Sequence, residues 1–266
     1  MEEIIKSVKK EGRYKIDKWL DDEDIILTTK IINEINCKKG ETRGVFTNTQ
    51  KANFVELLKF QFDKKKQRNY FLNLAKKLNL KKISDEILGH PSKLIRFDCY
   101  IVQVSNNPVL DWHFDNAYSG KQNIQKFIHP DNFSLKFFFY LTDVETNNGC
   151  LSYIPESHII AYVLRKGIFS GEISYTPYWS IEQFRKTIQI KKNYDYIQKN
   201  IGSNSLDRFI ENTKSENLTD NKFDLSVKKG GAVIFNEGGA HRGSKTSKTH
   251  RLALRFFFKK DIKGFN

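Results

Sequence analysis

The tetrapeptide Trp-His-Phe-Asp at residues 112–115 carries the clearest chemical pattern in the chain. It sets His113 and Asp115 two residues apart at the end of Val109–Phe114, a short run whose composition predicts a strand. Side chains two apart on a strand point to the same face, so an imidazole nitrogen and a carboxylate oxygen would converge. These are two of the three ligands of the 2-His-1-carboxylate set, which binds non-haem Fe(II) with open positions. By itself the pair is a weak signal, because a strand histidine beside an acid is the simpler alternative.

A third ligand must come from elsewhere, and His241 is well placed to supply it. It follows the predicted strand Ala232–Asn236 and lies in Glu-Gly-Gly-Ala-His-Arg-Gly, residues 237–243. Glycines there would let the backbone turn sharply and bring His241 toward a metal. Arg251 opens the next predicted strand, and its guanidinium group could bind a dicarboxylate end-on through a bidentate fork. Arg255 shares that strand face and is the rival.

Two further polar residues have structural as well as chemical interpretations. His158 follows Pro155 and is interpreted as a structural residue that caps a turn. Lys136 lies in an apolar strand, where it could neutralise an anion or extend from an edge strand to water. Neither residue enters the candidate metal site at this point.

The elements that would position these residues change in character near residue 90. The first part of the chain reads as mainly helical, as in Asn69–Leu80, where the apolar residues fall at helical spacing. Further on, runs rich in β-branched and aromatic residues predict strands. These strands are Leu94–Val104, Val109–Phe114, Leu135–Leu141, Cys150–Ile154, Phe223–Lys228, Ala232–Asn236 and Arg251–Phe258.

Between the two groups of strands lies a more polar block. Ser180 followed by Gln183 predicts a capping box before a helix that runs to about Ile190, and Leu206–Asn212 predicts another short helix. We interpret this block as an insertion or lid. The order of elements predicts a mainly β fold with flanking helices, a sandwich or jelly roll. One domain is expected over residues 1–266: a helical part at 1–93, a core at 94–164 and 221–258, and the insertion at 165–220.

Composition and charge narrow the class of protein. A hydrophobic share of 39% with 13% aromatic residues argues against disorder. The chain contains no run of eighteen apolar residues, so no membrane span is expected. The cysteines Cys37, Cys99 and Cys150 form no CxxC pair, and a reducing, cytoplasmic setting fits them best.

The net charge of +14 lies outside the stretch with the proposed chemistry, since residues 91–165 carry six basic and seven acidic side chains. The excess raises the odds of an anionic partner, but the lysines are scattered and form no stripe. A lysine-rich solvated surface is therefore the simpler interpretation. Nucleic acid is not favoured as a partner, while a small anionic metabolite remains an option.

The sequence resembles the phytanoyl-CoA dioxygenase-like family of Fe(II)/2-oxoglutarate oxygenases over roughly residues 95–258. The matching stretches are Trp112–Asp115, Leu135–Val144, Asn148–His158, and Gly231–Asn236 followed by His241-Arg-Gly and Arg251. Their order, spacing and strand context agree. Residues 1–90 and about 165–220 show no motif of the family.

The resemblance implies a double-stranded β-helix (a cupin-like jelly roll) with iron at its open end. It implies His113, Asp115 and His241 as the iron ligands, with no catalytic side chain beyond them. The retained carboxylate at Asp115 disfavours halogenation, because related halogenases have a small residue there. The family often has glycine where this chain has Glu156, in a segment that we take to be structural.

The resemblance also implies 2-oxoglutarate and O2 as co-substrates. Arg251 would bind the distal carboxylate of 2-oxoglutarate, and Gln103 and Tyr100, on the strand before the first histidine, are further candidates for co-substrate binding. The implied reaction hydroxylates a C–H bond of a small molecule and releases succinate and CO2. The alternative is a catalytically inactive, metal-binding cupin-like module that binds a ligand or partner.

Overall fold

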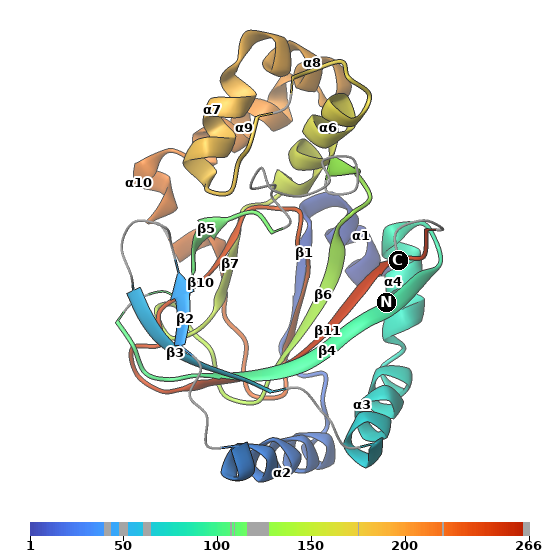
Figure 1. Cartoon of the computed structure of the whole chain (residues 1–266), viewed down its shortest axis with the longest axis vertical. Coiled ribbons are helices and arrows are strands. Elements are labelled where there is room, and N and C mark those ends of the chain that lie inside the picture. Colours follow the sequence, from blue (N-terminus) through green and yellow to red (C-terminus); the bar gives the residue numbers. More distant parts are fainter. Residues whose placement is uncertain are drawn as a thin grey trace.

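The computed structural model describes residues 1–39, 44–47, 53–60, 65–106, 108, 110–115, 128–174, 176–219 and 221–262. Two sheets with flanking helices make up this part of the chain (Figure 1). The larger sheet has the strand order β1-β9-β6-β11-β4-β3-β2, and the smaller has the order β5-β10-β7-β8. All pairs between these strands are antiparallel. A mainly antiparallel β fold with flanking helices is therefore confirmed.

The bounds of the elements follow the chain order. The strands are β1 (Arg13–Ile16), β2 (Gly44–Thr47), β3 (Asn53–Phe60), β4 (Ser92–Val102), β5 (Leu110–His113), β6 (Ser134–Tyr140), β7 (Leu151–Tyr153), β8 (Asp224–Leu225), β9 (Ala232–Asn236), β10 (His241–Gly243) and β11 (Arg251–Lys260). The helices are α1 (Glu2–Glu11), α2 (Asp22–Lys39), α3 (Lys65–Lys77), α4 (Leu80–Leu88), α6 (Ser157–Phe169), α7 (Ile181–Gln189), α8 (Lys191–Ile201), α9 (Ser203–Asn212) and α10 (Ser215–Leu218).

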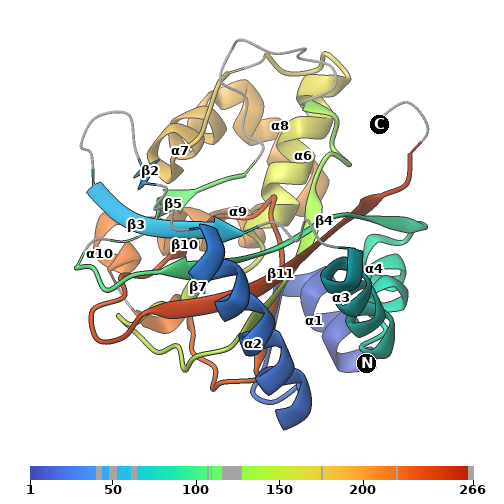
Figure 2. The same cartoon turned by 60° about the horizontal axis from the view of Figure 1, so that its bottom comes forward.

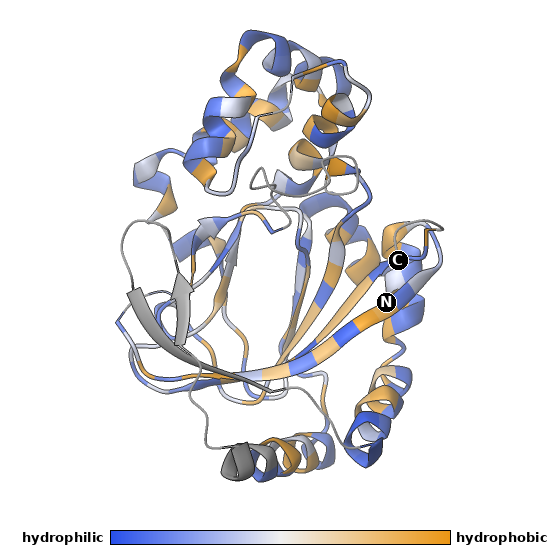
Figure 3. Cartoon of the chain, viewed as in Figure 1, coloured by the Kyte–Doolittle hydropathy of each residue, from blue (hydrophilic) through white to orange (hydrophobic). Residues whose placement is uncertain are grey.

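The larger sheet is covered on both faces, and the period-2 alternation of its strands decides which side chains face the site. In β6, Leu135, Phe137 and Phe139 pack into a core shared with the N-terminal helices. Phe138 and Tyr140 point to the opposite face, into the core between the two sheets. β6 lies between β9 and β11, so its predicted central position is confirmed. The alternation of apolar and polar segments is visible along β4 and β11 in Figure 3.

The N-terminal part is less helical than predicted. Helices α1, α3 and α4 gather beside the larger sheet (Figure 2), but β1 pairs with β9 and β3 pairs with β4. The predicted helix Asn69–Leu80 is in fact divided, because α3 ends at Lys77 and Asn79 takes a left-handed conformation (φ 55°) before α4 begins. Short strands such as β1 leave little periodic signal, and pairing with a distant strand stabilises them.

The predicted insertion forms a helical layer, α6–α10, at one end of the molecule (Figure 1). Its apolar residues make a core of their own, to which Trp112 of β5 and the adjoining Phe114 also belong. Helix α6 covers Ser157–Phe169, so it begins before the expected start of the insertion at residue 165. The helices in the described part of the chain are too short or too polar to span a membrane.

The predicted capping box of α7 is confirmed. The Ser180 hydroxyl accepts a hydrogen bond from the Gln183 backbone N–H at 3.2 Å. The Gln183 side-chain oxygen accepts one from the Ser180 backbone N–H at 3.1 Å. We expect Ser180→Ala to lower the free energy of unfolding by about 1 kcal/mol, because the cap satisfies a helix-end donor. Urea unfolding of the wild type and the variant measures this difference. An unchanged midpoint would contradict it.

His158 is buried in α6, where its Nε2 lies 3.2 Å from the Lys9 carbonyl oxygen. Burial lowers the pKa of His158 to about 4 from its ordinary 6.5. The unfolded chain binds a proton at His158 more readily than the folded chain does, so protonation of this histidine favours unfolding. The contribution of neutral His158 to the free energy of unfolding is therefore complete above about pH 6.5 and declines as the pH falls toward 4. The structural interpretation of this histidine fits its position between two helices.

We expect the wild type to lose about 2 kcal/mol of stability through His158 between pH 7.5 and about pH 5. His158→Gln lacks this titration, so its stability deficit relative to the wild type should shrink over that interval. Guanidinium unfolding of both proteins at the two pH values measures the change, and other titrating groups cancel in the comparison. A constant deficit would rule out the protonation of His158 as its cause.

Candidate metal centre

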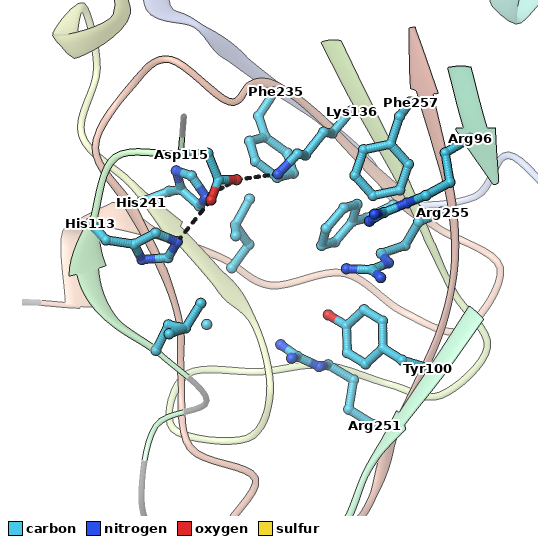
Figure 4. A pocket seen from close by; sticks show the side chains of 14 residues that line it. Arg96, Tyr100, His113, Asp115, Lys136, Phe235, His241, Arg251, Arg255 and Phe257 are labelled. Carbon is cyan, nitrogen blue, oxygen red and sulfur yellow. Dashed lines mark hydrogen bonds and ion pairs between the residues drawn. The ribbon is translucent and has the colours of Figure 1, made fainter. Parts of the chain in front are cut away.

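His113, Asp115 and His241 come together at the edge of the space between the two sheets (Figure 4). One ligand atom from each lies within 4.8 Å of the others. Nε2 of His113 is 3.5 Å from Asp115 Oδ1, and Nε2 of His241 is 3.3 Å from Asp115 Oδ2. The sequence pattern thus corresponds to one compact group of two imidazoles and a carboxylate.

Strand pairing explains why the two histidines meet. β5 and β10 are antiparallel neighbours, and His241 lies directly opposite His113 in their register. Side chains of directly opposed residues share a face of the sheet, and the two rings have centroids 4.4 Å apart. Asp115 follows two residues after His113, just beyond the end of β5, and its carboxylate reaches the same point.

Backbone carbonyls fix the orientation of both imidazole rings. Nδ1 of His113 lies 2.7 Å from the Asp111 carbonyl oxygen, and Nδ1 of His241 lies 2.8 Å from that of Gly239. Each Nδ1 therefore donates its proton to the carbonyl, which leaves Nε2 as the free lone pair. Burial and the nearby His113 ring lower the pKa of His241, which favours its neutral, metal-binding form.

A buried lysine holds the carboxylate of this group. Lys136 Nζ donates a hydrogen bond to Asp115 Oδ2 and lies 3.2 Å from Glu237 Oε2. Burial alone would raise the pKa of Asp115, but the positive charge of Lys136 holds it well below its ordinary value. Lys136 is on a central strand and is buried, so the edge-strand interpretation was wrong. Glu237 was missed by sequence reasoning, although it opens the glycine-rich segment before His241.

A cavity of about 240 Å³ adjoins these residues. Figure 4 shows His113, Asp115 and His241 on one side and Arg96, Tyr100, Arg251 and Arg255 on the other, with the guanidinium groups directed toward the space between them. All of them line the cavity, together with Lys136 and apolar residues that include Phe138 and Phe235.

The two rival arginines differ in their partners. Arg251 is buried, and its Nη1 donates to the Gly149 carbonyl oxygen at 2.7 Å. Its Nε has no hydrogen-bond partner among the described residues. Arg255 instead donates from Nε to Asp98 Oδ1 at 2.6 Å. Arg251 thus has a buried donor that still needs an acceptor, as an arginine that binds a co-substrate carboxylate would.

The two weaker candidates occupy different places. Tyr100 lines the cavity, and its ring contacts both arginines, with Arg251 Cζ 5.0 Å and Arg255 Cζ 4.4 Å from its centroid. Gln103 is not among the residues lining the cavity, and its backbone carbonyl accepts a hydrogen bond from Thr246 Oγ1 at 2.6 Å. The structure brings Tyr100 to the site but not the Gln103 side chain.

The glycines before His241 serve a different purpose from the one expected. Neither Gly238 nor Gly239 has a positive φ, so a sharp turn that only glycine can make is not required. A Cβ on Gly239 would instead overlap the Tyr153 phenol, and one on Gly238 would lie 2.7 Å from the Phe133 ring. The segment needs small residues because it passes close to these aromatic rings on its way to β10.

The helical layer contacts the metal-ligand group directly. The Trp179 ring stacks on His113 with centroids 5.1 Å apart and an interplanar angle of 21°. The Phe114 amide donates to the Trp179 carbonyl oxygen at 3.0 Å. Sequence reasoning missed this residue, which directly precedes the helix cap at Ser180. From the sequence we also expect the loop Asn116–Phe133 to shape the pocket, but residues 116–127 lie outside the described residues.

Two imidazole nitrogens and one carboxylate fit a divalent first-row metal, and this ligand set is typical of non-haem Fe(II). Both imidazoles have the second hydrogen bond that orients metal-bound histidines. The residues present therefore fit an iron ion, and the unpartnered Nε of Arg251 fits a carboxylate nearby.

Comparisons with known proteins agree with this geometry. The model of the family described as phytanoyl-CoA dioxygenase (PhyH) matches residues 33–253. No curated protein matches the chain at a significant level. Solved structures do match, at low sequence identity, and at that level the likeness concerns the fold alone.

Three of these structures illustrate the likeness. The epimerase SnoN in complex with Fe3+, alpha ketoglutarate and nogalamycin RO is 11% identical, with a TM-score of 0.59 over 100% of this chain and 91% of its own. HygX from Streptomyces hygroscopicus, with nickel and 2-oxoglutarate bound, is 12% identical, with a TM-score of 0.59 over 98% and 88%. The carbocyclase SnoK from nogalamycin biosynthesis is 14% identical, with a TM-score of 0.56 over 98% and 84%.

Proposed function

The chain belongs to the phytanoyl-CoA dioxygenase family, and on this premise we propose that it is an Fe(II)- and 2-oxoglutarate-dependent dioxygenase. It hydroxylates a C–H bond of a small molecule and releases succinate and CO2. The observation that carries the proposal is the cluster of His113, Asp115 and His241, whose ligand atoms lie within 4.8 Å of one another beside a cavity that Arg251 also lines.

Each residue has a defined part in this proposal. His113 and His241 would hold Fe(II) through Nε2, and Asp115 would hold it through its carboxylate. Lys136 donates a hydrogen bond to Asp115 Oδ2 and would hold the carboxylate in place for the metal. Arg251 binds the distal carboxylate of 2-oxoglutarate with its buried guanidinium group. Tyr100 packs beside Arg251 and limits its movement. The bound iron supplies the O2 chemistry that oxidises the C–H bond.

The setting of the site is part of the proposal. We infer that the two sheets form the double-stranded β-helix of a single domain, with α6–α10 as an insertion over its open end. The HygX and SnoN structures contain 2-oxoglutarate or alpha ketoglutarate with a metal, which supports the same co-substrate here.

A cytoplasmic location suits Fe(II) and the free, buried cysteines Cys99 and Cys150. The substrate is a small molecule, and the basic side chains of the cavity favour an anionic one.

Anaerobic titration of the metal-free protein with Fe(II) and then 2-oxoglutarate tests the proposal. The wild type should develop the weak visible charge-transfer absorption of an iron-bound keto acid. His241→Ala should lose this absorption, and Arg251→Ala should require more 2-oxoglutarate to reach it. A folded, iron-loaded wild type that shows no absorption would refute the proposal.

Admitting O2 then separates an enzyme from the alternative, a metal-binding module without catalysis. An enzyme of this type should turn over 2-oxoglutarate slowly to succinate even without its substrate. A module that binds iron and 2-oxoglutarate but forms no succinate above the level of free Fe(II) would support the alternative.

A further inference from the structure

The cavity holds two separate guanidinium sites opposite the metal ligands. Arg251 and Arg255 lie four residues apart on β11, which places their Cα atoms about 13 Å apart on one face of the sheet. The Tyr100 ring contacts both guanidinium groups, and its hydroxyl points into the cavity beside them (Figure 4). Each arginine therefore offers a hydrogen-bonding fork of its own, and the proposed function uses only the one at Arg251.

Among the described residues, the charges around Arg255 are not balanced. Asp98 is fully buried and pairs with two guanidinium groups, Arg255 Nε at 2.6 Å and Arg96 Nε at 3.0 Å. One carboxylate for two arginines leaves this group of three with an excess positive charge. Lys136, in contrast, pairs with two carboxylates, Asp115 and Glu237.

The surplus charge faces an accessible space. The Arg255 side chain is 15% exposed and that of Arg96 is 42% exposed, although Asp98 is completely covered. A second cavity of about 290 Å³ shares Arg96, Asp115, Lys136 and Phe257 with the first. A continuous lining thus runs from Arg96 to the metal ligands. Charge in a partly dry space is unfavourable without a partner, and a bound anion would supply it.

The cofactors of the proposed function leave this surplus in place. Fe(II) carries two positive charges and 2-oxoglutarate carries two negative charges, so together they cancel. 2-Oxoglutarate has one carboxylate for the metal and one for Arg251, and none is left for Arg255. The remaining single charge matches one carboxylate, whose planar geometry fits an arginine fork.

We propose that Arg255, oriented by Asp98 and supported by Arg96, binds a carboxylate group of the substrate. The substrate is then a small or slender carboxylic acid, because it shares a cavity of about 240 Å³ with 2-oxoglutarate. Its oxidised C–H bond lies between this carboxylate and the metal. The inference rests on the proposed function and names the substrate class for the same site.

Calorimetric titration tests the carboxylate site without depending on turnover. The probes are straight-chain monocarboxylates from propionate to octanoate, each compared with its amide and with the matching alkyl phosphate. The proteins are the anaerobic Fe(II)/2-oxoglutarate complex and the metal-free form. We expect a carboxylate to bind the wild type, and Arg255→Gln to bind it about 10- to 100-fold more weakly, since hydrogen bonds to charged groups are strong. The affinity for 2-oxoglutarate should stay within about threefold of the wild type, because Arg251 is intact.

Two further variants guard against indirect effects. The double variant Asp98→Asn/Arg255→Gln removes both members of the ion pair, so that no buried carboxylate loses a partner; it should also lose carboxylate binding. Arg185→Gln removes one positive charge from α7, where Arg185 donates to the Thr213 carbonyl oxygen at 2.8 Å, outside the cavity lining. It should bind the probes as the wild type does.

Several outcomes would overturn the inference. They are the absence of carboxylate binding to the wild-type complex, equal binding by Arg255→Gln, tighter binding of the alkyl phosphates, and a loss of 2-oxoglutarate affinity in Arg255→Gln as large as that in Arg251→Gln. Failure of the proposed function has a different signature, because the charge-transfer absorption would be missing. Carboxylate binding by the metal-free protein that depends on Arg255 would then still support the site.

Discussion

Asp115→Asn will lower the affinity for Fe(II) by more than about 100-fold while the protein stays folded. Even the residues that hydrogen-bond to metal ligands contribute about 10- to 100-fold to metal affinity. Asp115 is the anionic member of the ligand group, and an amide oxygen is a much weaker donor to a divalent metal. The fold should tolerate the change, because Lys136 keeps its ion pair with Glu237. Iron content after anaerobic dialysis against a weak chelator measures the loss.

A matched control makes the same change of a carboxylate to an amide outside the site. Asp195→Asn alters an exposed residue of α8 that pairs with Lys191. It should retain iron as the wild type does. Stoichiometric iron in Asp115→Asn would show that Asp115 is not a ligand and that another acid completes the site.

Lys136→Met will destabilise the metal-free protein by about 3–5 kcal/mol, the usual cost of removing one partner from a buried ion pair. The substitution leaves Asp115 and Glu237 without the cation that now lies between them. A divalent metal supplies positive charge at the same place. Binding of Mn(II) or Fe(II) should therefore raise the melting temperature more in Lys136→Met than in the wild type.

Glu237 completes a thermodynamic cycle for this prediction. In Lys136→Met/Glu237→Gln one of the two stranded carboxylates is gone, so part of the lost stability should return. Urea unfolding of the four proteins without metal gives the coupling energy between Lys136 and Glu237. A loss in Lys136→Met below about 1 kcal/mol would mean that the ion pair contributes little.

Strands with a strong local pattern of residues could be predicted from the sequence. β9 has the predicted bounds Ala232–Asn236, and β6 and β11 agree with their predicted runs within a few residues. The predicted Ser180 capping box is present. β1 escaped prediction because four residues give no clear periodicity, and its place depends on pairing with β9. The family match begins at residue 33, well before the stretch that shows the resemblance.

Some residues of the site could likewise be predicted from the sequence, and others could not. His113 and Asp115 are two residues apart in the sequence, so a strand alone brings them together. The approach of His241 depends on the pairing of β5 with β10, a three-residue strand that sequence reasoning did not predict. Lys136 meets Asp115 only through the packing of the two sheets, and Glu237 meets Lys136 only because β9 pairs with β6. Contacts between distant segments leave no spacing in the sequence from which they could be read.

The cross-strand pairing of His113 with His241 makes the metal a check on folding. A slip of β10 by one residue would turn Arg242 toward the site and His241 away from it, because side chains alternate along a strand. The slipped form would lack one ligand and would bind iron less tightly. Iron present during folding would therefore favour the correct alignment of β5 and β10 over its neighbours. Metal binding would in this way select the correct strand register before the ion takes part in any reaction.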